Sequence, residues 1–276
     1  MAVDRETPQS PVLTGRQFCA VCAALLIAIT TSSSGQTPAV DTSPLAAAGR
    51  AFNAGQYDQV EDLLQSVNGE ASAVLRARAH VARGRYGEAE KLLAGVAGTT
   101  PAGDAALELG LLQLYLGRRP QGMRTLEVVL TRSPNGTPAD LIRLGRAARV
   151  LGRFQDANGF FRNANALAPN DPVINTGWGE LFLEKYNRSE ALKSFQSALK
   201  ARADYVPAQV GLAETTLEED PPAAKSAIEA ALKINPSYVP AHLLLAELAL
   251  DNRERTEAQA AVQKALAVNP NSLEAR

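Results

Sequence analysis

Few side chains in this sequence could bind a metal ion or act on a substrate. Its 276 residues include two histidines, His80 and His242, and two cysteines, Cys19 and Cys22. The histidines lie far apart in the sequence, so they give little basis for a histidine metal site or a Ser-His-Asp triad. The sequence also contains no GxxxxGK[ST] motif, no HExxH motif and no GxGxxG bounded by a strand. We therefore expect this chain to have no catalytic residue, no metal ion and no cofactor.

The polar residues with regular spacing are acidic. Glu180, Glu214 and Glu247 recur at nearly equal intervals along the chain. A leucine follows each of them after three residues and a second carboxylate after four, spacings that place side chains on one helical face. Carboxylates beside leucines would suit a partner segment in which Lys or Arg alternates with apolar residues. The leucine and the second carboxylate that follow each glutamate are Leu183 with Glu184, Leu217 with Glu218, and Leu250 with Asp251.

Charge is divided unevenly along the chain, although the formal net charge is only −1. Residues 70–165 contain 14 Lys or Arg and 8 Asp or Glu, a net charge of +6, whereas residues 166–276 contain 11 and 15, a net charge of −4. This polarity either serves binding or is ordinary variation in surface charge. A nearly neutral chain without an aromatic-basic stripe is a poor match for nucleic acid. No basic amphipathic helix indicates binding to a membrane.

The helices that must position these residues are indicated by an internal repeat. Pro236 and Pro270 each close a run reading Ala-Leu-x-(Ile/Val)-Asn-Pro. The sequence Tyr-Val-Pro-Ala begins at Tyr205 and again at Tyr238, and this interval is nearly the same as the one between the two prolines. A repeat of about this length is typical of a solenoid of stacked units. Strand-like alternation is absent, and proline ends helices because it cannot donate to the helical ladder. We therefore predict an all-helical chain.

Small residues at fixed positions indicate how the helices pack. Gly152, Phe154 and Ala157 are a turn glycine, an aromatic residue and a small residue, and Phe161 and Ala164 continue one helical face at spacings of four and three. Earlier glycine-aromatic pairs are Gly55 with Tyr57 and Gly84 with Tyr86. The preceding helix of each unit carries a large-small doublet that would let its partner helix approach closely. These doublets are Leu109-Gly110, Leu144-Gly145, Trp178-Gly179, Leu212-Ala213 and Leu245-Ala246.

At these residues the chain resembles the tetratricopeptide repeat (TPR) family. The resemblance covers residues 44–276 and implies an all-α, right-handed superhelix, or α-solenoid, of antiparallel helix pairs with a concave groove. We expect about seven repeats followed by an incomplete eighth. The expected repeats are 41–69, 70–102, 103–137, 138–171, 172–205, 206–238 and 239–272.

The resemblance also implies which side chains face the groove. The heat-shock co-chaperone members hold a peptide's terminal carboxylate with a Lys/Asn clamp, but no lysine or asparagine occupies these positions here. We expect a non-catalytic scaffold that binds an unidentified protein or peptide segment in the groove. The candidate groove residues are Arg78, Leu111, Tyr115, Arg146, Arg149, Glu180, Leu183, Glu184, Glu214, Leu217, Glu218, Glu247, Leu250 and Asp251.

The beginning of the chain indicates export. Phe18 to Thr30 is a continuous run of about a dozen mostly apolar residues, too short to span a bilayer but long enough for the core of a signal peptide. We predict a signal peptide at residues 1–35, cleaved after Gly35, and a short linker at residues 36–43. Both cysteines would be removed with it. The mature protein is therefore expected to be periplasmic or secreted.

The end of the chain leaves two functions open. Residues 271–276 read as the start of another first helix, and no polar capping helix follows, although solenoids normally finish with one. In one interpretation the chain is a scaffold, and self-association covers the uncapped last repeat. In the other, which we favour for this end of the chain, the protein continues beyond Arg276. The repeats could then be the accessory domain of a longer exported enzyme, such as a hydrolase or peptidase.

Overall fold

The computed structural model describes residues 41–276, which form helices and the turns between them, with no strand in this part of the chain. The predicted signal peptide 1–35 and residues 36–40 of the predicted linker lie outside the described residues. The described helices are α2 (Pro44–Asn53), α3 (Tyr57–Leu64), α4 (Glu70–Ala82), α5 (Tyr86–Ala97), α6 (Asp104–Tyr115), α7 (Arg119–Arg132), α8 (Pro138–Val150), α9 (Phe154–Leu167), α10 (Pro172–Glu184), α11 (Arg188–Ala201), α12 (Val206–Thr216), α13 (Pro221–Ile234), α14 (Val239–Asp251) and α15 (Arg255–Val268).

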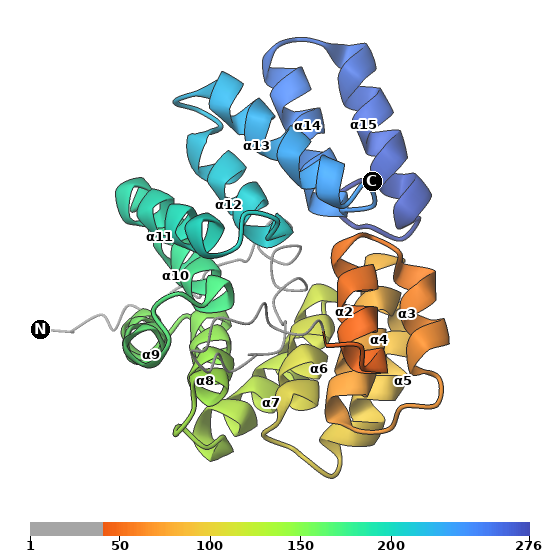
Figure 1. Ribbon diagram of the computed structural model, residues 1–276, viewed down its shortest axis with the longest axis vertical. Helices are drawn as coiled ribbons and strands as arrows, with labels where there is room; N and C mark the ends of the chain where they lie inside the picture. The colour runs from red at the N-terminus through yellow and green to blue at the C-terminus, as the bar shows by residue number, and fades with distance from the viewer. Residues whose placement is uncertain (1–40) are drawn as a thin grey trace, which may run out of the picture.

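The helices follow one another as antiparallel pairs around a curved solenoid (Figure 1). α2 packs against α3, α4 against α5, and the same pairing continues to α14 and α15. The first helix of each pair also packs against the first helix of the next pair, so the core continues from pair to pair along the chain. This arrangement confirms the predicted all-α solenoid of antiparallel helix pairs.

Local sequence signals set where helices begin and end. Thr137 starts α8 with a capping box, in which its hydroxyl accepts from the backbone N–H of Asp140 and the Asp140 carboxylate accepts from the backbone N–H of Thr137. Pro138 follows at the first helical position, where its missing N–H costs nothing. In the turns within the second and third pairs, Gly84 and Gly117 have φ angles of +71° and +76°. Glycine adopts such angles without the steric penalty that a side chain would bring.

The small and large side chains predicted to face the core do so. Ala157, Phe161 and Ala164 of α9 are fully buried. The Phe161 ring packs against Gly145 of α8, in its own pair, and against Gly177 of α10, in the next pair. A Cβ atom at either glycine would lie 3.0 or 2.9 Å from ring atom Cε1, closer than neighbouring side chains normally approach. The small residue of the doublet therefore has its predicted role of admitting the partner helix.

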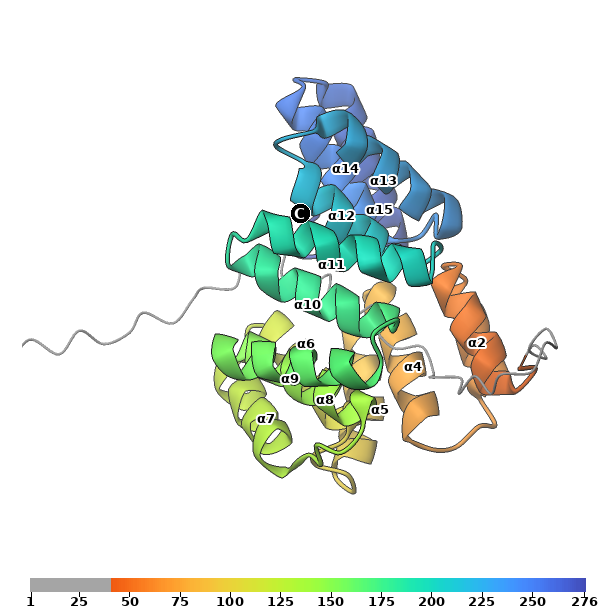
Figure 2. The same cartoon turned by 60° about the vertical axis from the view of Figure 1, so that its left-hand side comes forward.

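The solenoid curves so far that its last pair lies beside its first (Figures 1 and 2). The Tyr57 hydroxyl at the start of α3 donates a hydrogen bond to the Ser237 carbonyl between α13 and α14, at 3.4 Å. The Tyr115 hydroxyl at the end of α6 donates to the Glu274 carboxylate at 3.0 Å. We call the contact of residues 235–238 and 269–274 with the first three repeats the seam.

The C-terminal residues differ from the sequence-based expectation. Residues 269–276, where an incomplete eighth repeat was expected to begin, contain no helix. They extend instead along the first repeats of the same chain, where the backbone N–H of Leu273 donates to the Tyr115 hydroxyl at 3.2 Å. The edge of the last repeat, which one of the two interpretations left to self-association, is thus in contact with the first repeats of the same chain.

Candidate functional site

The curved solenoid, with its last pair beside its first, forms a ring. Inside this ring, the first helices of consecutive pairs place charged side chains next to one another. Arg78 of α4 donates to Glu108 of α6 at 2.5 Å, and Arg146 of α8 approaches the same carboxylate oxygen at 2.8 Å. All three side chains are almost completely buried. Burial opposes the charge on Glu108, but the two arginines together hold the pKa of this carboxyl below its usual value. One buried ion cluster therefore connects three repeats.

A second ion cluster connects α8 with α10. Arg149 is buried and forms an ion pair with Glu180, and its Nε atom lies 3.7 Å from Oε1 of Glu184. Burial is the main reason that the pKa of Glu184 is raised; the attraction of Arg149 lowers it in part, and repulsion by Glu180 raises it further. This second cluster shows that charges of opposite sign from adjacent repeats meet at the middle of the chain.

The excess of basic residues in the first half of the sequence therefore does not form a free basic surface in the predicted groove. The expected groove residues Arg78, Arg146 and Arg149 are buried beside carboxylates. Glu180 and Glu184 belong to the same clusters. These five side chains connect the first helices of neighbouring repeats, which is a structural role.

Near the C-terminal end, an acidic cavity of about 330 Å³ lies between α12, α14, α15 and the C-terminal residues. Its walls combine carboxylates with leucines, and Leu250 is 59% exposed. Four of the fourteen candidate groove residues come together here: Glu214, Glu247, Leu250 and Asp251. The residues that define the acidic cavity are the carboxylates Glu214, Glu247, Asp251 and Glu274 and the leucines Leu243 and Leu250.

Four further candidates lie outside this cavity. Leu111 and Leu217 are buried in the core between helices, and Leu183 is half-buried against it. Glu218 lies beyond the end of α12 at Thr216, so the helical spacing used to place it on the inner wall does not apply. Its side chain is 75% exposed and pairs with Arg188 at 2.7 Å.

Two important carboxylates were missed in the sequence. Glu108 stands alone in an apolar run of α6, and this isolation is a signal that could have found it, because a buried charge needs a partner. Glu274 follows the last recognisable repeat. Nothing in the repeat pattern assigns it a position, because its place depends on the chain returning to its first repeats.

Each of the two histidines lies beside a backbone or side-chain oxygen of the protein. Nε2 of His242 lies 2.8 Å from the Pro236 carbonyl oxygen, and burial lowers the pKa of this imidazole. His80 lies 3.4 Å from the Glu61 carboxylate. Within the described residues, no cluster of three or more His, Cys, Asp or Glu side chains could hold a metal ion.

None of the helices described between residues 41 and 276 is both long and apolar enough to span a membrane.

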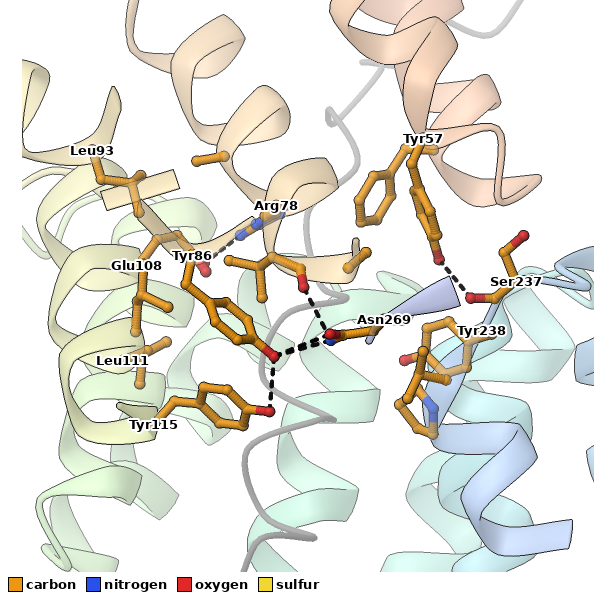
Figure 3. Close-up of a pocket in the computed structure, with 17 residues that line it drawn as sticks. Tyr57, Arg78, Tyr86, Leu93, Glu108, Leu111, Tyr115, Ser237, Tyr238 and Asn269 are labelled. Carbon is orange, nitrogen blue, oxygen red and sulfur yellow. Dashed lines mark hydrogen bonds and ion pairs between the residues drawn. The ribbon is translucent and has the colours of Figure 1, made fainter. Parts of the chain in front are cut away.

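A second, smaller cavity lies at the seam and has a volume of about 70 Å³ (Figure 3). Tyrosines from the first repeats form one side of it, and Tyr238 and Asn269 from the last repeats form the other. The hydroxyls of Tyr86 and Tyr115 point toward one another and lie 3.1 Å apart. The remaining candidate groove residue, Tyr115, therefore belongs to the seam.

Stacked helix pairs with an inner face define the chain as a helical-repeat solenoid, a class whose curved surfaces bind other proteins. Tetratricopeptide repeat profiles match residues 74–136 and residues 216–276. The chain therefore contains tetratricopeptide repeats, and these repeats support a role as a scaffold for protein–protein interaction.

Solved structures share the fold at low sequence identity. A chain of the APC/C hetero-tetramer Cut9–Hcn1 is 18% identical with a TM-score of 0.52, over 86% of this chain and 48% of that one. A thermophilic TPR protein of Thermus thermophilus is 23% identical with a TM-score of 0.53, over 62% of this chain and 93% of that one. The chain thus spans about half the length of the first of these structures. A sequence comparison with curated proteins gives no match.

Proposed function

We propose that this protein is a non-catalytic scaffold that binds a segment of a partner protein in the acidic cavity. The segment carries Lys or Arg side chains interleaved with apolar ones. The observation that supports this assignment is the composition of the cavity, in which the carboxylates of Glu214, Glu247 and Asp251 line the same walls as Leu243 and the exposed Leu250. A basic segment with apolar residues matches both the charge and the chemistry of these walls.

The two kinds of side chain make different contributions to binding. Exposed ion pairs contribute only about 0–1 kcal/mol each, so the carboxylates chiefly orient the partner and speed its association. Burying the side chain of Leu250 against an apolar partner residue removes more surface from water and slows dissociation. We therefore expect an association rate that falls with added salt and a dissociation rate that depends little on salt.

Binding is tested with short, immobilised synthetic peptides in which Lys and Leu recur at varied spacings. Matched peptides carry Glu in place of every Lys. In the variant Glu247→Gln/Asp251→Asn, association with the Lys peptides should slow several-fold and its salt dependence should flatten. Leu250→Ser should mainly speed dissociation. Equal binding of Lys and Glu peptides, or their shared failure to bind, would overturn the proposal.

A control with the same change in net charge is available on the chain. Glu218 and Glu219 are 75% and 74% exposed at a turn outside the cavity. The variant Glu218→Gln/Glu219→Gln should therefore bind the peptides as the unchanged protein does. Slower association in this control, equal to that of the cavity variant, would mean that only overall charge matters.

The proposal also includes a location outside the cytoplasm, periplasmic or secreted. Its support is the apolar run of residues 18–30, of the length of a signal-peptide core. The test is intact-mass analysis of the protein isolated from the envelope fraction and the medium of the native cells. We expect a mature chain that begins at Gln36. An uncleaved chain confined to the cytoplasm would contradict this location.

A further inference from the structure

The seam is built from one docking arrangement that occurs twice. On one side are two Gly-x-Tyr turns, at residues 55–57 and 84–86, and on the other are two Asn-Pro turns, at residues 235–237 and 269–271. Each asparagine lies against one of the glycines: a Cβ atom added at Gly55 or Gly84 would lie 2.2 Å from the Oδ1 atom of Asn235 or Asn269. Both motifs were visible in the sequence as helix ends and turns, and they meet here.

In the first copy of this arrangement, the Asn235 amide donates to the Tyr57 hydroxyl at 3.2 Å. Tyr57 in turn donates to the Ser237 carbonyl at 3.4 Å. Asn235 is 2% exposed, so these polar groups are sheltered from water and depend on one another for hydrogen bonds.

The second copy repeats the first one helix pair further along. The Asn269 amide donates to the Tyr86 hydroxyl at 3.0 Å, and this hydroxyl lies 3.2 Å from the Asn271 carbonyl oxygen. The Asn271 side chain donates to the Gly84 carbonyl at 3.1 Å. The agreement between the two copies shows that the turns of the last repeats are complementary to those of the first.

The same contact reaches the acidic cavity. Tyr115 donates to the carboxylate of Glu274 and accepts from the backbone N–H of Leu273. Burial raises the pKa of Tyr115 well above its ordinary value, so its hydroxyl keeps the proton that it donates. Glu274 also lines the acidic cavity, and Pro240 lines both this cavity and the smaller cavity at the seam. One wall of the acidic cavity is therefore held in place by a residue of α6.

The contacts at the seam are of a kind that can open without unfolding the repeats. Extensive helix packing in residues 41–276 joins only helices that are adjacent or next but one in the sequence. The seam combines hydrogen bonds between turns with a small apolar contact: Val268 packs against the first repeat, and Tyr238 and Pro240 line the smaller cavity together with Phe52 and Val81. Breaking it leaves every pair packed against its neighbours.

We propose that the seam is a latch that closes the ring and, in closing, completes the acidic cavity. When the latch opens, Glu274 leaves the cavity and the last repeats move away from the first. If the latch completes the acidic cavity, partner binding and closure of the ring favour one another. This consequence rests on the proposed function. Because such coupling is reciprocal, a bound basic segment should close the ring as strongly as closure tightens its binding.

The first test measures closure without a partner, on the full chain. Gly84→Ala places a methyl group where the hydrogen-bonded Asn269 side chain lies, at a φ of +71°. Gly117→Ala is the matched control, because Gly117 has a φ of +76° and a Cβ atom there would meet nothing within 4 Å. Asn235→Ala/Asn269→Ala is the second seam variant and introduces no strained backbone.

Small-angle X-ray scattering should show a larger maximum dimension for Gly84→Ala and for the double asparagine variant than for Gly117→Ala, with equal helical circular dichroism. Amide exchange in residues 269–276 should accelerate in the seam variants alone. If neither seam variant opens, or if both open only together with loss of helical signal, the latch does not exist.

The second test measures coupling, with the Lys-Leu peptide that binds the unchanged protein best. We expect it to bind the seam variants about tenfold more weakly than Gly117→Ala, and to restore the compact dimension of the seam variants at saturation. Equal affinity for open and closed variants would overturn the coupling. If no peptide binds even the unchanged protein, the proposed function fails, and the latch is then decided by the scattering and exchange data.

Discussion

Consecutive repeats and the seam join the same kind of helix pair by opposite means. Between consecutive repeats, a large apolar side chain such as Phe161 enters a space left by glycines on two neighbouring helices. At the seam, amides and hydroxyls of turns exchange hydrogen bonds. Apolar interlocking contributes several kcal/mol for each large side chain, whereas a neutral hydrogen bond contributes only about 0.5–1.5 kcal/mol net. The stability of the fold should therefore reside in the repeats, and the seam should set only the shape.

The largest expected effect is that of emptying one interlocked position. Phe161→Ala removes a fully buried ring that contacts both α8 and α10. Because the cavity cannot collapse completely, the free energy of unfolding should fall by about 3–5 kcal/mol, measured by urea denaturation. Exposed Arg162→Ala is the control and should change it by less than about 0.5 kcal/mol. A loss below about 1 kcal/mol for Phe161→Ala would show that the repeat contacts are no stronger than the seam.

A buried charge is expected to have an effect of similar size. Glu108→Gln leaves Arg78 and Arg146 buried without their carboxylate, and breaking such a cluster costs about 3–5 kcal/mol. In the unchanged protein the lowered pKa of Glu108 means that its charge stabilises the fold above its usual value of 4.5. That contribution is lost as the pH falls through the lowered pKa of the folded state.

The pH dependence supplies the measurement for this variant. Urea denaturation at pH 7 and at several values below the usual glutamate pKa should show a smaller loss of stability for Glu108→Gln than for the unchanged protein. Exposed Glu229→Gln serves as the control and should follow the unchanged protein. If acid destabilises the Glu108→Gln variant by as much as the unchanged protein, Glu108 does not act through its charge.

Overpacking the core should lower the free energy of unfolding by less than removing a large side chain from it. Ala157→Leu introduces a bulky side chain into the fully buried contact between α8 and α9, where it should cost about 1–3 kcal/mol. Thermal and urea unfolding provide the measurement, with Arg162→Ala again as control. Equal melting temperatures for the two variants would mean that the face of α9 has been misassigned.

The packing of the repeats could be predicted from the sequence because its cause is local. The small-large-small spacing of Ala157, Phe161 and Ala164 and the small residue at Gly145 recur in unit after unit, and the structure places them in the core as expected. The positions of the candidate groove residues followed less directly from local spacing. Glu218 was placed by extending a helical spacing, but α12 ends at Thr216.

The seam could not be predicted, because it depends on the curvature accumulated over the whole solenoid. Small rotations between pairs decide whether the last repeat meets the first, and no local motif encodes their sum. The Asn-Pro and Gly-x-Tyr motifs were visible, but they were interpreted as helix ends and turns. Their partners lie 178 to 188 residues away, as for Asn235 with Tyr57 and Asn269 with Val81.

The smallest expected change in overall stability comes from the seam itself. Asn235→Ala removes the amide that donates to Tyr57 and the oxygen that accepts from the backbone N–H of Ser237. Because the repeats remain packed when these bonds are lost, the free energy of unfolding should fall by only about 0.5–1.5 kcal/mol. Amide exchange in residues 235–240 should nevertheless accelerate clearly, since local opening is governed by the local contacts.

A matched asparagine makes this last measurement decisive. Asn252 follows α14 as Asn235 follows α13, but it is exposed and lies away from the seam. Asn252→Ala should therefore leave both the unfolding free energy and the exchange of residues 235–240 within error. If both variants accelerated exchange equally, Asn235 would act only as a helix end, and if Asn235→Ala cost as much as Phe161→Ala, the seam would hold the fold together. Faster exchange at residues 235–240 with a loss of at most about 1.5 kcal/mol is the outcome that separates closing the ring from stabilising the repeats.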